Sequence, residues 1–387
     1  MVSSEQQDAD ACDGPPRTRR LGAWVAWPAL VVVAAALVAF TMVTHLGHVS
    51  RHTLVVASMP YWNIQSDTAV VLANRGTVNE ASPWIYGLSA SGAIVPQYAP
   101  GQAPAIAAAI AKLRAAQLRI VPSIANVTGG NWDYQPIARI LHNPALLRQH
   151  VAAIVALVQR QDYAGIDIDY EELQASDRNA VTLFVTELAR ALHAHGKILC
   201  IAVFPQTAAP ASGDSNAAQD YAALGQAADQ IRIMGYNNHW ADSAPGATAP
   251  IGWVRSVLRF ATSQIPPGKV VLGIPLFGYD WPARNAPAAP VSWRQALRLS
   301  RQYQVPARYA TASQALYFSY SDAGSTHIVW FENAASSKAK FAVAKADGLA
   351  GVFLWMYGPE DPGTWPALRA VLPIGRPNAS STSGTVP

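Results

Sequence analysis

Residues 165–172 read GIDIDYEE, which places four carboxylates within eight residues of a chain whose charged fraction is only 13%. Three of them, Asp167, Asp169 and Glu171, occupy alternate positions between apolar residues. In a β-strand alternate residues share a face, so a strand here would have one apolar and one acidic face. Because burying unpaired charges is costly, packing alone does not explain this pattern. The stretch therefore indicates a functional site on a buried strand.

Seven further apolar runs are spaced along the chain like the strands of βα units. The eight expected strands are 53–62, 83–89, 118–125, 165–172, 197–204, 230–236, 269–279 and 351–357. The expected helices between them are 102–116, 145–161, 176–195, 217–227 and 251–264. Near-continuous apolar runs are typical of strands buried on both faces. The pattern predicts an α/β fold, a (β/α)8 or TIM barrel. A doubly wound open sheet is the alternative, but no GxGxxG follows the first strand.

The gap after the seventh strand is the longest and predicts a small insertion in the barrel. It contains a helical stretch near 292–304 and two alternating segments, ALYFSYS and HIVWFE, on either side of SDAGST. The two segments predict a hairpin, and a second helix is expected near 336–346.

The N-terminal segment differs from the rest of the chain. Residues 21–44 contain no charged residue or histidine, and this is longer than the roughly 20 residues that span a bilayer. Three arginines lie at positions 17, 19 and 20, which predicts a cytoplasmic N-terminus. We expect a cytoplasmic tail at 1–20 and a transmembrane signal anchor at 21–46. The protein would then be a single-pass cell-membrane protein whose 53–372 domain is extracytoplasmic; secretion after signal cleavage is the alternative.

Composition limits the other classes of function. The 51% hydrophobic fraction supports a large core, while the net charge of +4 is not gathered in one folded segment, so no nucleic-acid partner is expected. The two cysteines, Cys12 and Cys200, form no metal-binding cluster or disulfide framework. Residues 373–387 are rich in Pro, Ser and Gly and are expected to be disordered. We expect a monomer without a metal or cofactor.

The acidic strand suits acid–base chemistry. Active sites of such barrels lie at the C-terminal ends of the strands, where Glu171 is placed. Carboxyls that are close together in a low-dielectric pocket do not both ionise easily, so one keeps a proton and can act as a general acid. A metal site or a buried ion-pair network is the alternative. A metal would need further ligands, and the late-strand positions carry no basic residue, so catalysis is favoured.

Three motifs resemble family 18 glycoside hydrolases, the chitinase-like barrels. GIDIDYE resembles the strand-4 signature DGxDxDxE, and MGYNNHW (234–240) is similar to the strand-6 motif MxYD, with Met234 and Tyr236 matching. Trp355 resembles the tryptophan that ends strand 8 of the family. Residues 318–355 most resemble the branch of spore-germination and cortex-lytic peptidoglycan hydrolases. The resemblance covers residues 53–372.

The resemblance implies a substrate-assisted mechanism, in which the sugar's own acetamido group is the nucleophile. Glu171 would protonate the leaving oxygen, and Asp169 would hold the acetamido N–H and stabilise the oxazolinium ion. Asp167 would support Asp169, and the Tyr236 hydroxyl would orient the acetamido oxygen. The implied substrate is a polymer of β-linked N-acetylhexosamine, peptidoglycan rather than chitin. A non-catalytic envelope glycan-binding protein on the same barrel is the alternative, and the retained Glu171 favours an enzyme.

The same resemblance suggests substrate-binding residues. Trp355 would form the floor of a sugar subsite, Trp240 is a further stacking candidate, and Met234 belongs to the strand-6 motif. Asn237 replaces the Asp of that motif and Ala164 replaces the first Asp of the strand-4 signature. An amide keeps the shape of the carboxyl but loses its charge, so Asn237 would alter sugar contacts or the pH profile.

Two further polar residues lie at or directly after the ends of expected strands. Asn126, the first residue of an NVT sequon after the third strand, either faces the cleft or holds the loop. Glu172 is expected to point away from the barrel axis and to be paired at the surface.

Overall fold

Eight parallel strands form a closed ring in the computed structural model, which describes residues 53–209, 213–282, 287–355 and 360–374. In ring order they are β1 (Leu54–Pro60), β2 (Glu80–Leu88), β5 (Ser123–Ala125), β8 (Gly165–Asp169), β9 (Ile198–Val203), β10 (Gln230–Ile233), β11 (Val270–Pro275) and β17 (Gly351–Trp355). β17 pairs with both β11 and β1, which closes the ring. The predicted (β/α)8 barrel is confirmed, and the open-sheet alternative is wrong.

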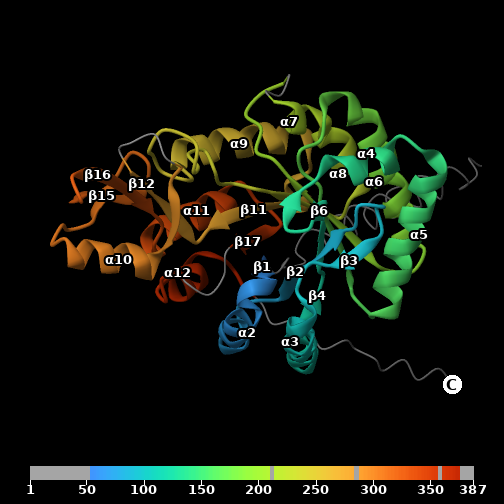
Figure 1. Ribbon diagram of the computed structural model, residues 1–387, viewed down its shortest axis with the longest axis horizontal. Coiled ribbons are helices and arrows are strands. Elements are labelled where there is room, and N and C mark those ends of the chain that lie inside the picture. The colour runs from blue at the N-terminus through green and yellow to red at the C-terminus, as the bar shows by residue number, and fades with distance from the viewer. Residues whose placement is uncertain (1–52, 210–212, 283–286, 356–359, 375–387) are drawn as a thin grey trace, which may run out of the picture. The chain divides into compact units, whose positions relative to one another are not determined.

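Helices cover the outside of the ring (Figure 1). They are α2 (Ile64–Ala73), α3 (Ala103–Ala115), α4 (Tyr134–Leu141), α5 (Pro144–Arg160), α6 (Arg178–His193), α7 (Asp214–Ala218), α8 (Tyr221–Ala227), α9 (Ile251–Gln264), α11 (Ala334–Ala346) and α12 (Thr364–Val371). Local signals fix several starts: Asn143 Oδ1 accepts from the amides of Ala145 and Leu146, at 3.0 and 3.2 Å, and so caps α5. The five helices predicted between strands are present, although the 217–227 stretch is divided between α7 and α8.

β3 (Ile94–Pro96) extends the barrel sheet beyond the ring and runs antiparallel to β2. β4 (Arg119–Ile120) pairs parallel with β2 just before β5 and so belongs to the third strand of the ring. β3 forms a hairpin with β2 on the flank of the barrel, close to α5 (Figure 1).

The alternation in GIDIDYEE produces two different faces of β8. Ile166 and Ile168 are buried in the main core between the ring and its helices. Asp167 and Asp169 face the barrel interior, with 4% and 7% of their surface exposed. The predicted acidic face is therefore buried inside the barrel, where each charge needs a partner or a proton.

The insertion after the seventh barrel strand is a second sheet. Its five antiparallel strands, in spatial order, are β13 (Ala289–Ser292), β12 (Phe277–Pro282), β16 (Ser325–Phe331), β15 (Ala315–Asp322) and β14 (Arg308–Ala310). With α10 (Trp293–Gln302) these strands lie together at the left of Figure 1, beside the barrel. The predicted helix and the β15–β16 hairpin are confirmed, but the insertion is larger than that pair.

The predicted strand at 269–279 is wrong as a single element. β11 ends at Pro275 in the barrel, and β12 begins at Phe277 in the second sheet. The chain changes sheets because β12 pairs antiparallel with β13 and β16 instead of continuing along the ring. Gly278 permits this pairing, since a Cβ atom there would lie 2.0 Å from the Trp330 carbonyl oxygen.

The predicted cytoplasmic tail (1–20) and signal anchor (21–46) lie outside the described residues, as do residues 375–387 of the predicted C-terminal tail. Within the part of the chain that the structure describes, no helix has both the length and the apolar character needed to cross a bilayer.

A buried ion pair connects the second sheet to the helix that returns the chain to the barrel. Lys340 Nζ on α11 donates to Glu332 Oε2, directly after β16, at 2.7 Å. The side chains of both residues are almost completely buried, at 0% and 1% exposure. Glu332 Oε1 has no hydrogen-bond partner within the described residues. Within the described residues, Lys340 is therefore the one cation that forms an ion pair with the buried charge of Glu332.

Replacing Lys340 with Met should lower the free energy of unfolding by about 3–5 kcal/mol, because it leaves the Glu332 charge buried and unpaired. Chemical denaturation measures this difference. The double variant Lys340→Met with Glu332→Leu should recover most of the loss, since it buries no charge. Equal stabilities of the wild type and the Lys340→Met variant would show that the pair contributes nothing.

Candidate active site

A cavity of about 710 Å³ opens at the C-terminal ends of the barrel strands. All eight residues that the sequence predicted for the site line it: Asp167, Asp169, Glu171, Met234, Tyr236, Asn237, Trp240 and Trp355. They come from β8 and β17 and from the segments that follow β8 and β10. The ring brings them together because parallel strands end at the same edge of the barrel.

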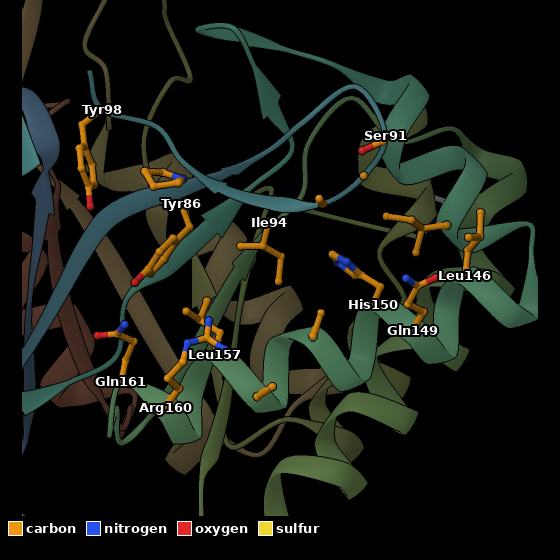
Figure 2. Close-up of a pocket in the computed structure, with 16 residues that line it drawn as sticks. Tyr86, Ser91, Ile94, Tyr98, Leu146, Gln149, His150, Leu157, Arg160 and Gln161 are labelled. Carbon is orange, nitrogen blue, oxygen red and sulfur yellow. The ribbon is translucent and has the colours of Figure 1, made fainter. Parts of the chain in front are cut away.

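A second cavity, of about 700 Å³, lies on the flank of the barrel. Figure 2 shows that side chains of the β2–β3 hairpin, such as Tyr86 and Ile94, line one side of it, and α5 residues such as His150 line the other. No Asp or Glu is among the described residues that line it, and Arg160 is the charged side chain among them. It therefore lacks the paired carboxyls that β8 places in the other cavity, and the cavity over β8 is the candidate active site.

Asp167 is held at the floor of the cavity by its neighbours on both sides. It lies level with Ser123 on β5 and Cys200 on β9. The Ser123 hydroxyl donates to Asp167 Oδ2 at 2.7 Å, and Arg232 Nη1 lies 3.2 Å from the same oxygen. Burial raises the pKa of Asp167, whereas Arg232 and then the Ser123 hydrogen bond act to lower it.

Asp169 is less well compensated. The indole N–H of Trp84 donates to its Oδ2 at 2.9 Å, while its Oδ1 has no hydrogen-bond partner within the described residues. Burial, and next the charge of Asp167, raise the pKa of Asp169 to about 7, against the opposing effects of Trp84 and Arg232. Asp169 is therefore able to hold or release a proton near neutral pH.

Glu171 lies just beyond the hydrogen-bonded part of β8 and is half-buried. Burial, followed by the charges of Asp169 and Glu172, raises its pKa well above the ordinary range. A carboxyl that keeps its proton at neutral pH has the property required of a general acid.

Asn126 fixes the backbone at Glu171. Its Oδ1 accepts from the Glu171 amide at 2.8 Å, and its Nδ2 donates to the Glu171 carbonyl at 2.9 Å. Asn126 is fully buried and is not part of the cavity lining. Of the two interpretations of this residue, the structure supports the one in which it holds the loop, and it also connects the end of β5 to the acid.

Tyr236 and Asn237 follow β10 at the cavity wall. Burial, and next the charges of Asp169 and Glu171, raise the pKa of the Tyr236 phenol well above its ordinary value, so the hydroxyl stays a donor. Asn237 has a φ of +62°, a left-handed conformation that asparagine tolerates better than most residues. Its exposed side chain accepts a hydrogen bond from the Tyr279 hydroxyl at 3.2 Å, so the second sheet contacts this wall residue.

Aromatic rings form another wall of the cavity. Trp84 lies edge-on to Trp355 and to Trp132, with ring centroids 6.3 and 6.2 Å apart. Trp240 is 48% exposed at the rim, where a sugar ring has access to it. Trp132 was not predicted; the signal for it was an aromatic residue directly after the TGGN loop of the third strand.

The late-strand positions carry no basic residue, but the inference drawn from this, that the acidic strand has no ion-pair partner, is wrong. Arg232, on the inward face of β10, forms ion pairs with Asp167 and with Glu80 of β2. The sequence does not indicate this role, because Arg232 lies within the apolar run QIRIMGY, before the polar residues at the end of that strand. The expectation for Glu172 is also wrong: it is exposed, has a φ of +54°, lines the rim of the cavity, and forms no ion pair within the described residues.

A protonatable carboxyl beside a second carboxyl, at the mouth of a (β/α)8 barrel walled by aromatic rings, defines an active site of the glycosidase class. Residues 56–359 match the model of the glycosyl hydrolases family 18. The chain belongs to this family and is a glycoside hydrolase, which confirms the family and the enzyme class expected from the sequence motifs.

Comparisons with individual proteins agree with this assignment. The chain is 34% identical over 247 residues to the cortical fragment-lytic enzyme of Bacillus anthracis; the match covers 62% of this chain and 57% of that relative, so this chain spans less than two thirds of its length. A chitinase structure from Chromobacterium violaceum has a TM-score of 0.76 at 31% identity, covering 82% of this chain and 98% of that one. The Bacillus cereus spore cortex-lytic enzyme SleL has a TM-score of 0.76 at 28% identity, covering 84% and 76%.

The raised pKa of Asp169 predicts a cost in stability that depends on pH. Since its pKa is about 7 in the folded protein and about 3.9 in an unfolded chain, the stabilising contribution of the protonated form is lost as pH rises from about 4 to about 7. Asp169→Asn should therefore be more stable than the wild type at pH 8, by about 2–4 kcal/mol, and close to it at pH 4.

Chemical denaturation at both pH values measures this difference. The exposed Asp347 provides a matched control, because Asp347→Asn makes the same chemical change outside the cavity and should follow the wild type at both pH values. A constant difference between Asp169→Asn and the wild type across this range would contradict the raised pKa.

Proposed function

We propose that the protein hydrolyses polymers of β-linked N-acetylhexosamine by substrate-assisted catalysis with retention of configuration, and that its substrate is peptidoglycan rather than chitin. The observation that carries the mechanism is the placement of Glu171, an acid with a raised pKa, beside Asp169 in one cavity. Family membership supports the reaction class, and the spacing of the three carboxylates supports the division of roles.

In the first step the Glu171 carboxyl donates its proton to the glycosidic oxygen as the bond from that oxygen to the anomeric carbon breaks. The carbonyl oxygen of the sugar's acetamido group forms a new bond to the anomeric carbon, which gives an oxazolinium ion. In the second step the Glu171 carboxylate accepts a proton from water, and that water oxygen attacks the anomeric carbon as the bond from this carbon to the acetamido oxygen breaks, which restores the acetamido group. Two inversions at this carbon retain its configuration.

The neighbouring groups orient and stabilise the acetamido group. Asp169 accepts a hydrogen bond from the acetamido N–H, and the negative charge of the Asp167–Asp169 pair offsets the positive charge that develops on the ring. Tyr236, which stays protonated, donates to the acetamido oxygen and fixes its line of attack. Asp167 supports Asp169 from the floor of the cavity. Trp355 and Trp240 offer flat surfaces on which the C–H faces of pyranose rings pack.

The preference for peptidoglycan has two supports. Relatives of this chain are named cortical fragment-lytic and spore cortex-lytic enzymes. The predicted membrane anchor would also hold the domain next to the cell wall. Similarity to a chitinase structure keeps chitin as the competing substrate. A non-catalytic glycan-binding protein is less well supported, because Glu171 and both aspartates are retained in the cavity.

Glu171→Gln should lower kcat for a glycan substrate by about 10²–10⁴-fold, because the amide has no proton of suitable acidity to donate. Glycan binding, measured by titration calorimetry, should change little. Glu187→Gln makes the same chemical change on the exposed face of α6 and should retain wild-type activity. Equal hydrolysis by the Glu171→Gln variant and the wild type would exclude Glu171 as the acid.

A thiazoline analogue of the oxazolinium ion should inhibit the wild type competitively, whereas no inhibition would argue for a different nucleophile.

Product analysis decides the substrate. Incubating the full chain with purified peptidoglycan should release muropeptide fragments that mass spectrometry identifies by a new reducing N-acetylhexosamine end. Chito-oligosaccharides at the same concentration of sugar should be cleaved more slowly. The opposite ranking would make chitin the substrate and leave the mechanism unchanged.

A further inference from the structure

Arg232 lies between two buried carboxylates in the barrel interior, where it lines the floor of the catalytic cavity. Its Nη1 is 3.2 Å from Asp167 Oδ2 and donates to the Ser82 hydroxyl at 2.7 Å. Its Nη2 forms an ion pair with Glu80 Oε1. Arg232 is 2% exposed and Glu80 is fully buried, so water does not screen these charges.

Glu80 is shared with a second arginine. The Nε and Nη2 atoms of Arg119, on β4, lie 2.7 and 2.5 Å from Glu80 Oε2, and Gln230 Nε2 donates to the same oxygen at 3.2 Å. The Arg119 side chain is 43% exposed, so the network reaches solvent at the end of the barrel opposite the cavity.

The charges of this network balance one another without a contribution from Asp169. The two guanidiniums, Arg119 and Arg232, offset the two carboxylates, Glu80 and Asp167. Among the described residues, the neutral indole of Trp84 is the one hydrogen-bond donor to Asp169, so a negative charge on Asp169 has no cation of its own there. A proton bound by the pair of aspartates is therefore more stable on Asp169 than on Asp167.

We propose that Arg232 is an electrostatic positioning residue that keeps Asp167 ionised, so that the aspartate pair carries a single proton in the working pH range, and that Glu80 limits this effect by sharing the guanidinium. This inference rests on the proposed function, because it holds that Arg232 sets the pH at which the reaction rate falls on the acidic limb of the pH–rate profile. Below that limb both aspartates are protonated, and the negative charge that stabilises the oxazolinium ion is lost.

Within the described residues, six titratable or charged groups face the pair or its ion-pair partners. These groups are Glu171 after β8, Glu80 of β2, Arg119 of β4, Cys200 of β9, Arg232 of β10 and Tyr236 after β10. Burial raises the pKa of the Cys200 thiol and of the Tyr236 phenol well above their ordinary values, so both stay neutral in acid. The carboxylates and the two arginines therefore determine the acidic limb.

The test uses two substitutions whose effects have opposite signs. Arg232→Gln removes the cation beside Asp167 and should move the acidic limb of kcat/KM upward by about 1–3 pH units. Glu80→Gln removes the anion that shares Arg232 and should move the same limb downward, by up to about 1 unit. Arg232→Lys keeps the charge and should restore the limb to within about half a unit of the wild type, although it loses the bidentate geometry. Misfolding alone lowers activity without moving the two limbs in opposite directions.

The outcomes separate this inference from the proposed function. Active variants whose acidic limbs coincide with that of the wild type would overturn the role of Arg232 and leave the glycosidase mechanism intact. If the wild type hydrolyses no N-acetylhexosamine polymer, the proposed function fails, and ¹³C NMR titration of the aspartate carboxyls then tests Arg232 directly. In that measurement Glu80→Gln should lower the first pKa of the aspartate pair; an unchanged or raised value would overturn the inference. The same titration decides the matter if Arg232→Gln does not fold.

Discussion

Two arginines and two carboxylates offset one another inside the barrel, and this balance determines which acids of the site hold a proton. Burying a charge is tolerated only with a partner, and β8 turns two aspartates into the interior. Arg232 compensates Asp167 from a strand on the far side of β9. Within the described residues no cation forms an ion pair with Asp169, and burial and the charge of Asp167 raise its pKa to about 7. The protonation of the two aspartates in the cavity therefore depends on the ion pairs that Arg232 forms at its floor.

The position of the acid depends on a second kind of contact. β8 ends at Asp169, so no strand pairing fixes the chain at Glu171. The buried amide of Asn126 takes over that role, because it bonds to both the N–H and the carbonyl of Glu171. The side chain is left free of this bonding and half-buried at the cavity. A proton donor needs such placement, since catalysis falls steeply when a reacting group is misplaced by an ångström.

The sequence predicted the barrel and the cavity lining well, because both follow from local patterns. Continuous apolar runs mark buried parallel strands, and late polar residues on such strands meet at one edge of the ring. The Arg232–Glu80 pair could not be read in this way, since its members are 152 residues apart and meet only through the closure of the ring. The change of sheets after Pro275 was hidden for a related reason: residues 269–279 form one apolar run, and only the pairing partners distinguish β11 from β12.

The burial of Asn126 has a consequence for making this protein. Asn126, Val127 and Thr128 form a glycosylation sequon, a signal that usually marks a surface loop. Here the acceptor amide is fully buried and already bonded to the backbone of the acid, so the folded chain offers it to no transferase. A host that attaches glycans to chains during export would reach this amide before the barrel closes. Each chain modified there would lose the contact that places Glu171, so the yield of active enzyme would depend on the glycosylation machinery of the host.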